Sequence, residues 1–129
     1  MIARDIMTRD IISVAPTMTV KLLAKTLIKN QVGGVPVAGK NGKIIGIVSE
    51  ADILAKKGKD VKSIMSKKVI SVGEDTSVEE IAEAMTTHHI KRLPVMNNGR
   101  VVGIVSRADI VNAIALGKHV ALHTPVYDL

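Results

Sequence analysis

GIVSEADI occupies residues 46–53, and GIVSRADI occupies residues 103–110. The two octapeptides share seven of eight letters and lie 57 positions apart in a chain of 129 residues. In each, an apolar run is followed by Ser-x-x-Asp, a pattern typical of a strand that passes into a capped helix. The repetition indicates that the chain uses the same strand-to-helix junction twice.

The duplication extends over most of the chain. An offset of 57 or 58 residues aligns identical residues between Ile6 and Ile53 with those between Ile64 and Ile110. We therefore divide the chain into a first copy at 1–60, a second copy at 61–118 and a C-terminal tail at 119–129. A copy of this size buries little surface alone, so we expect the two copies to share a core.

Each copy predicts the element order β-α-β-β-α, which places the chain in the α+β class. The predicted strands are residues 11–14, 34–38 and 43–49 of the first copy, and 69–72, 92–96 and 100–106 of the second. Thr19 and Ser77 stand where helix N-caps belong, and an Asn-Gly pair in each copy predicts a tight hairpin turn. Pro36 and Pro94 suggest an edge strand or an irregular first strand position.

Composition excludes several kinds of protein. Hydrophobic residues make up 47% of the chain, but cysteine, phenylalanine and tryptophan are absent and Tyr127 is the single aromatic residue. There can be no disulfide framework, thiolate zinc site or cysteine nucleophile. We find no nucleophile–base pair, metal cluster, P-loop, signal peptide or membrane span. These observations predict a cytoplasmic protein with no membrane partner, no catalysis and no cofactor.

The net charge of +6 and the pI of about 9.7 suggest an anionic partner. Nucleic acid is one candidate, although no basic cluster is interleaved with aromatic residues that could stack on bases. Binding to nucleic acid through the basic surface therefore stays open as an alternative.

The repeated octapeptide has two interpretations. Ser49-x-x-Asp52 and Ser106-x-x-Asp109 match a capping box, which any strand-to-helix junction can use. The same geometry suits a nucleotide, because a helix N-terminus attracts phosphate and an aspartate can accept hydrogen bonds from ribose hydroxyls. Gly46 and Gly103 would let a ligand or a neighbouring backbone approach the strand.

These features together resemble cystathionine-β-synthase (CBS) domains, of which a tandem pair is called a Bateman module. The resemblance runs from about Ile2 to Gly117. It rests on the duplicated β-α-β-β-α order, the Ile-Met-Thr and Ile-Met-Ser openings, the two Pro-Val pairs and the two GIVS-x-AD strings. It implies two repeats related by pseudo-two-fold symmetry and packed through their sheets. It also implies a sensor of adenine nucleotides or S-adenosylmethionine that regulates a partner protein.

The resemblance implies two ligand sites in the cleft between the copies, each built around one aspartate that holds ribose hydroxyls. The residues implied for the first site are Asp52, Ser49, Ser66, Val69, Ser71, Lys91 and Arg92. The residues implied for the second site are Asp109, Ser106, Thr8, Ile11 and Ser13.

The copies differ at the basic pair that the resemblance assigns to phosphate. The second copy has Lys91-Arg92, where the first has Gly33-Gly34. If one site is stronger, we therefore expect it to be the site of Asp52, to which Lys91 and Arg92 are assigned.

Several other features carry less weight. The four histidines, His88, His89, His119 and His123, are expected to be structural or solvated, and Met7 and Met65 to fill gaps in the core. Lys21 and Lys25 align with Glu79 and Glu83, so a homodimer could pair the basic helix of one copy of the chain with the acidic helix of another.

We therefore predict a non-catalytic regulatory module that binds AMP, ADP or ATP, forms a homodimer and acts on a partner protein that the sequence does not identify. The alternatives are a sensor of S-adenosylmethionine, which lacks phosphate, and a nucleic-acid-binding protein.

Overall fold

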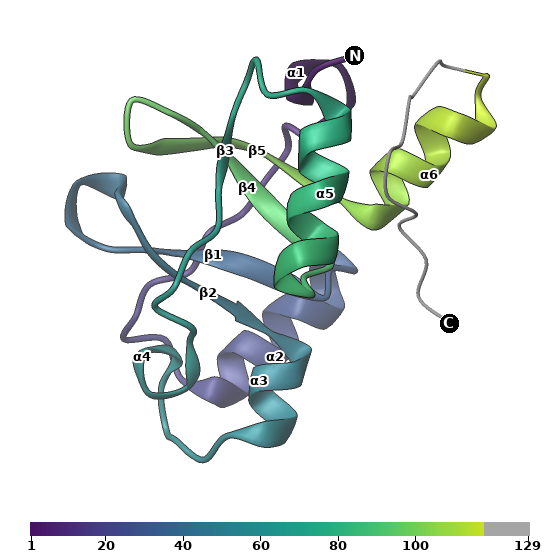
Figure 1. The fold of residues 1–129 in the computed structure, drawn as a ribbon. Coiled ribbons are helices and arrows are strands. Elements are labelled where there is room, and N and C mark those ends of the chain that lie inside the picture. The colour runs from purple at the N-terminus through teal and green to yellow at the C-terminus, as the bar shows by residue number, and fades with distance from the viewer. Residues whose placement is uncertain (118–129) are drawn as a thin grey trace. The chain divides into compact units, whose positions relative to one another are not determined.

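The computed structural model of the chain describes residues 1–117 (Figure 1). The chain divides into two compact units. We call Ile12–Val69 the continuous unit, and Met1–Ile11 together with the chain from Ile70 onward the split unit. The units do not coincide with the two sequence copies, because the opening segment of each copy belongs to the unit built mainly from the other copy.

The continuous unit contains a short sheet and four helical segments. Its elements are α2 (Val20–Asn30), β1 (Gly34–Ala38), the 3-10 turn η1 (Lys40–Gly42), β2 (Ile44–Ser49), α3 (Glu50–Ala55) and α4 (Val61–Ile64). Strands β1 and β2 pair in antiparallel fashion, and Val14 adds an isolated parallel bridge to Val37 of β1. Leu23 and Leu27 of α2 pack with Val35, Val48 and Ile64 in one buried cluster.

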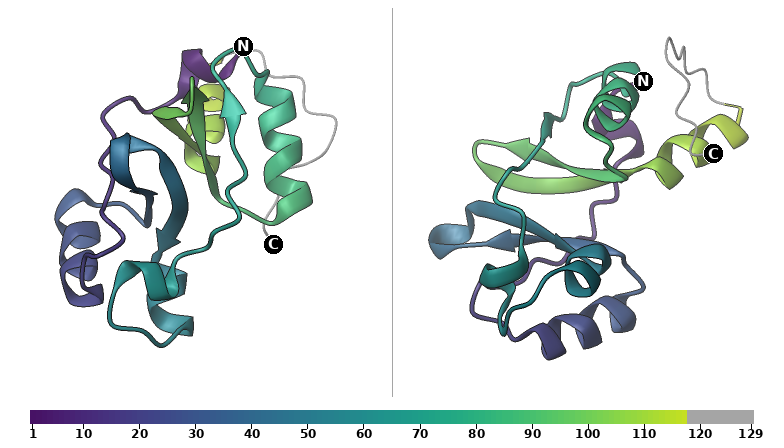
Figure 2. Two further views of the ribbon diagram at one scale, coloured as in Figure 1. Left: turned by 90° about the vertical axis from the view of Figure 1, so that its left-hand side faces the viewer. Right: turned by 60° about the horizontal axis from the view of Figure 1, so that its bottom comes forward.

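The split unit repeats this arrangement with one more strand. Its elements are α1 (Ala3–Ile6), β3 (Val72–Gly73), α5 (Val78–His88), β4 (Arg92–Asn97), β5 (Arg100–Ser106) and α6 (Arg107–Ala115). The strand order is β3-β4-β5, with β3 parallel and β5 antiparallel to β4. Figures 1 and 2 show α5 running beside these strands, with α1 near its N-terminal end. The core joins Ala3 and Met7 to Ile81, Leu93 and Val105.

The two long helices begin where the sequence predicts. Thr19 Oγ1 accepts a hydrogen bond from Leu22 N, and Ser77 Oγ accepts one from Glu80 N, each at 3.1 Å. Both residues are therefore N-caps that satisfy an amide at the open helix end. Each helix stops at a residue in the left-handed conformation, Gln31 for α2 and His89 for α5.

In each copy, the first strand is much shorter than the sequence predicts. Of residues 11–14 only Val14 forms a bridge, and of residues 69–72 only Val72 belongs to a strand. The physical reason is that both segments cross from one unit to the other, at residues 11–12 and 69–70. A strand needs a neighbour to satisfy its amides, and a crossing segment has one only where it joins a sheet.

The hairpin turns are confirmed. Asn98 and Gly99 have φ of 53° and 78°, as a tight hairpin turn requires. Pro36 lies in β1 of the two-stranded sheet, as expected for an edge strand, whereas the edge position expected for Pro94 is wrong. Pro94 lies inside β4, the central strand of its sheet, and not at an edge. It is tolerated opposite Ile104, because Ile104 directs its own amide and carbonyl to Thr8 on the other side of β5.

Gly46 and Gly103 accommodate a neighbouring segment of the chain. A Cβ at Gly103 would lie 2.5 Å from Met7 Sδ. At Gly46 it would lie 2.7 Å from Met65 Sδ and 2.8 Å from the Ser66 carbonyl oxygen. Met7 and Met65 are buried, which confirms their expected role in filling the core. The close approach of backbone and side chain therefore accounts for both glycines.

Within residues 1–117, none of the helices has both the length and the apolar character that crossing a membrane would demand.

Candidate functional site

The Asp109 corner, residues 106–109, joins β5 to α6 in the split unit. Ser106 N donates a hydrogen bond to Asp109 Oδ2 at 2.8 Å, and Asp109 N donates one to Ser106 Oγ at 3.2 Å. This reciprocal pair is a capping box, so the structural interpretation of the Ser-x-x-Asp motif is confirmed here. The cap also fixes the carboxylate of Asp109 at the start of the helix.

The Asp52 corner, residues 49–52, joins β2 to α3 in the continuous unit. Ser49 N donates to Asp52 Oδ2 at 2.9 Å, and Ser49 Oγ donates to the same oxygen at 3.2 Å. Lys56 Nζ forms an ion pair with the other oxygen, Oδ1, at 2.9 Å. Both oxygens of the Asp52 carboxylate therefore accept bonds from the protein itself.

Each corner has a neighbouring segment that the sequence assigned to the same site. Thr8 exchanges two backbone hydrogen bonds with Ile104, of 2.8 and 3.0 Å, two residues before Ser106. Ser66 exchanges the equivalent pair, also 2.8 and 3.0 Å, with Ile47, two residues before Ser49. The structure thus brings Thr8 to the strand of the Asp109 corner and Ser66 to the strand of the Asp52 corner.

Other predicted residues are distributed between the units. Ile11 belongs to the same unit as Asp109, and Val69 to the same unit as Asp52. Ser13 lies in the continuous unit and Ser71 in the split unit, so the grouping expected for each joins residues of different units and stays a prediction.

The basic pair Lys91-Arg92 lies beside the Asp109 corner within the split unit. The Lys91 carbonyl oxygen accepts from Arg107 N at 2.9 Å, and Arg92 is the partner of Ser106 in the strand register. Gly33 and Gly34 hold the same positions in the continuous unit, bonded to Glu50 and paired with Ser49. The predicted association of Lys91 and Arg92 with Asp52 joins the two units and stays a prediction.

Sequence reasoning missed Lys56. Its ammonium contacts Asp52 Oδ1 and also donates to the Ile64 carbonyl oxygen of α4 at 3.1 Å. The signal was available in the sequence, because an acid four residues before a lysine forms an ion pair on a helix surface. The second copy has Ala113 at the equivalent position, so the two corners differ in charge.

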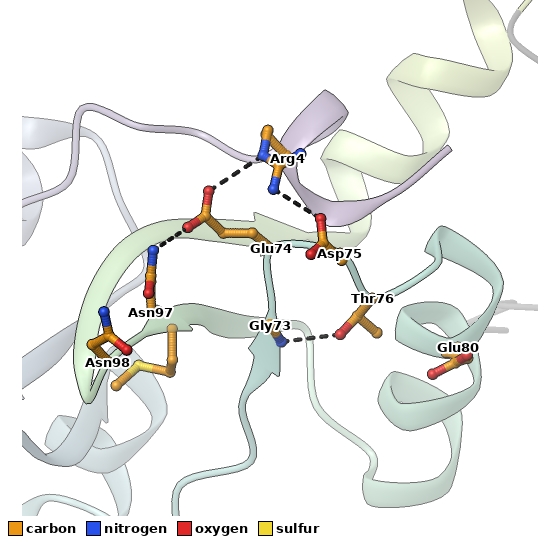
Figure 3. Close-up of a pocket in the computed structure, with 9 residues that line it drawn as sticks. Arg4, Gly73, Glu74, Asp75, Thr76, Glu80, Asn97 and Asn98 are labelled. Carbon is orange, nitrogen blue, oxygen red and sulfur yellow. Dashed lines mark hydrogen bonds and ion pairs between the residues drawn. The ribbon is translucent and has the colours of Figure 1, made fainter.

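The split unit also contains a polar pocket of about 530 Å³ that none of the predicted site residues lines (Figure 3). Glu74 accepts from Arg4 Nε at 3.4 Å with one oxygen and from Asn97 Nδ2 at 2.7 Å with the other. Arg4 also pairs with Asp75 at 2.8 Å. These bonds raise the pKa of Arg4, mainly through Glu74. The carboxylates thus tie α1 to the loop before α5.

His88 and His89 lie at the C-terminal end of α5 and are exposed, whereas His119 and His123 lie outside the described residues. Among residues 1–117, no three histidine or acidic side chains gather closely enough to hold a metal ion.

Comparison with known protein families identifies the family of this chain. The CBS domain family matches residues 3–58 and 61–116, so the chain belongs to this family. Two consecutive matches make it a CBS domain pair, and its two sheets with their helices agree with solved structures of such pairs.

Two similar solved structures contain bound ligands. The CBS domain pair of protein MJ0100, in complex with 5′-methylthioadenosine and S-adenosyl-L-methionine, has 32% identity and a TM-score of 0.86, covering 92% of this chain and 98% of that one. CBSX2 in complex with AMP has 28% identity and a TM-score of 0.85, with the same coverage.

A relative by sequence is the L-aspartate semialdehyde sulfurtransferase of Methanocaldococcus jannaschii, which is 34% identical over 113 residues. The match covers 84% of this chain but only 22% of that enzyme. The similarity is therefore confined to the CBS pair within a longer protein.

Proposed function

We propose that this chain is a regulatory module without catalysis of its own, which binds an adenosine-containing ligand through Asp52 and Asp109. The supporting observation is that both carboxylates are held by the N-cap amide, at 2.9 Å from Ser49 N and 2.8 Å from Ser106 N. An acceptor already fixed in place loses little freedom when ribose hydroxyls bind to it.

An adenine nucleotide is the preferred ligand, because the chain offers cations for its phosphate. Lys91 is exposed and Arg92 is half-buried, side by side at the start of β4. S-adenosylmethionine is the second candidate, since a solved CBS pair of 32% identity binds it. It has no phosphate, and so it would not use this basic pair.

Titration calorimetry with AMP, adenosine and S-adenosylmethionine separates these ligands. We expect Lys91→Ala to weaken AMP binding by about two- to fivefold and to leave adenosine binding unchanged, because the lost contact is an exposed charge pair. Lys43→Ala removes an exposed lysine of the β2 segment and serves as the control.

Other outcomes identify the alternatives. An equal loss for AMP and adenosine would exclude a phosphate contact, and tighter binding of S-adenosylmethionine would favour the second candidate. If none of the three ligands binds, and the chain binds nucleic acid with an affinity that falls steeply as the salt concentration rises, the nucleic-acid alternative is favoured.

We also propose that the chain forms a homodimer through its helices. The helices expose large apolar side chains, including Leu22 at 50%, Ile28 at 79% and Leu54 at 87%. In the split unit, α6 exposes Val111 at 61%. Apolar side chains gathered on helices in this way suit a protein interface. Lys25 of α2 and Glu83 of α5, both exposed, would pair basic with acidic helices of two chains.

A further inference from the structure

The two corners differ in how many hydrogen bonds their carboxylates already accept. Asp52 Oδ2 accepts from the amide and the hydroxyl of Ser49, and Oδ1 accepts from Lys56. At the Asp109 corner Oδ2 accepts from Ser106 N, and the Ser106 hydroxyl accepts from Asp109 N, as the capping box requires. A carboxylate has about four lone-pair sites, so each protein donor on it reduces what a ribose can use.

Lys56 lies four residues after Asp52 and immediately after the short helix α3. The helix ends at Ala55, and Lys56 is its C-cap, with an extended backbone at φ −121° and ψ 146°. Helix α6 continues to Ala115, so the equivalent residue, Ala113, is inside the helix and 3% exposed in the core. The local fold therefore supplies an ammonium group to Asp52 and a buried methyl group at the matching position after Asp109.

The ammonium group is held at two points. Besides its ion pair with Asp52 it donates to the Ile64 carbonyl oxygen, one residue before Met65 and two before Ser66. Lys56 thus connects the Asp52 carboxylate to the segment that contains another predicted site residue. A ribose that takes two bonds from Asp52 competes with an ammonium that has a second anchor.

We propose that Lys56 is a built-in competitor for the Asp52 corner, which makes the two ligand sites of the chain unequal. This inference rests on the proposed function. Ligand fills the Asp109 corner first, and it fills the Asp52 corner at higher concentration, after displacing Lys56 from Oδ1. This order is the reverse of the one expected from Lys91 and Arg92 alone.

The test isolates the Asp52 corner by working in chains that carry Asp109→Ala. AMP and S-adenosylmethionine are titrated by calorimetry into this chain and into versions with Lys56→Ala, Lys56→Arg or Lys57→Ala. We expect Lys56→Ala to tighten both ligands by about two- to fivefold, since a partly exposed ion pair is worth up to about 1 kcal/mol. Lys56→Arg keeps the cation and should restore weak binding. Lys57→Ala, with the same change in net charge, should have no effect.

Outcomes that contradict the role of Lys56 differ from those that contradict the proposed function. Weaker binding after Lys56→Ala would show that Lys56 contacts the ligand, and equal binding in all four chains would show that Lys56 has no effect on it. Either result would overturn the proposal that Lys56 competes with the ligand, without affecting the proposed sensor function. Absence of binding in the wild-type chain and in every variant would overturn the proposed function together with this inference. Thermal unfolding of each variant shows that the affinities refer to folded protein.

Discussion

The Asp52 and Asp109 corners contain the same serine and aspartate but surround the carboxylate differently. The Asp52 carboxylate neutralises a lysine four residues later, whereas the equivalent residue after Asp109 is an alanine buried in the core. The difference follows from one residue, Lys56 in the first copy and Ala113 in the second, and it is accompanied by a shorter helix, six residues in α3 and nine in α6. A duplicated motif can therefore keep its fold while its two copies acquire different affinities.

The short helices α1 and α4 offer a second comparison. In α4 the N-cap Asp60 accepts from Ser63 N at 3.0 Å and from Ser63 Oγ at 2.6 Å. In α1 the acid is at the other end of the turn, because Asp5 Oδ2 accepts from Ile2 N at 2.9 Å. The same four-residue turn is thus stabilised from opposite ends, and only α4 has an acid at its N-cap.

The largest effect is expected from Gly46→Ala. The new Cβ meets the Ser66 carbonyl oxygen at 2.8 Å, and this backbone group cannot move aside cheaply. We expect a loss of about 1–3 kcal/mol in the free energy of unfolding, measured with urea. Gly103→Ala should cost less, because its close contacts are all with the flexible Met7 side chain. Gly73→Ala, where the nearest atom is 3.7 Å away, is the control. An equal cost at Gly46 and Gly103 would contradict this difference between the units.

A smaller effect is expected from the charges of α2 and α5. Lys25→Glu should weaken the proposed homodimer by about two- to fivefold, measured by analytical ultracentrifugation at low salt. Adding Glu83→Lys to the same chain should restore it, because the basic and acidic helices then exchange roles. Lys40→Glu makes the same change of charge on η1 and should have no effect. A double variant as weak as Lys25→Glu would argue against pairing of these helices.

The smallest effect concerns acid stability at Asp60. Its hydrogen bond from the Ser63 hydroxyl, followed by that from the Ser63 amide, lowers the pKa of the carboxyl. A pKa lowered by folding stabilises the chain above the ordinary value of about 3.8, and this contribution is lost as pH falls through the lowered value. Urea midpoints measured below about pH 4 should therefore fall less steeply for Asp60→Asn than for wild type.

Much of the fold could be predicted from the sequence, because the capping residues and hairpin turns act locally. Thr19, Ser77 and the Asn-Gly pairs each determine their own turn, whatever lies elsewhere in the chain. The exchange of opening segments does not follow from such local signals, and it was expected only from the family resemblance, which groups the opening segment of each copy with the aspartate of the other. Met7 and Met65 are identical residues facing identical glycines, so periodicity cannot say which methionine meets Gly46 and which meets Gly103.

The candidate site, like the fold, could be predicted from the sequence only in part. The serine and aspartate of each corner were predicted from spacing, because a capping box needs only four consecutive residues. The spacing of Lys56 from Asp52 was visible in the sequence, but its second contact, with the carbonyl of Ile64 in the following short helix, was not. The grouping expected for Ser13 and Ser71 joins residues of different units, which local patterns do not determine.

The most direct test of the account is calorimetric titration of AMP into wild type, Asp109→Ala and Asp52→Ala. We predict two unequal binding events in the wild type. Asp109→Ala should weaken the tighter event by about ten- to a few hundred-fold, because a charge-assisted hydrogen bond to ribose is lost. Asp52→Ala should keep the tighter event and lose the weaker one. Equal affinities at the two corners, loss of the tighter event in Asp52→Ala, or binding indifferent to both aspartates would contradict it.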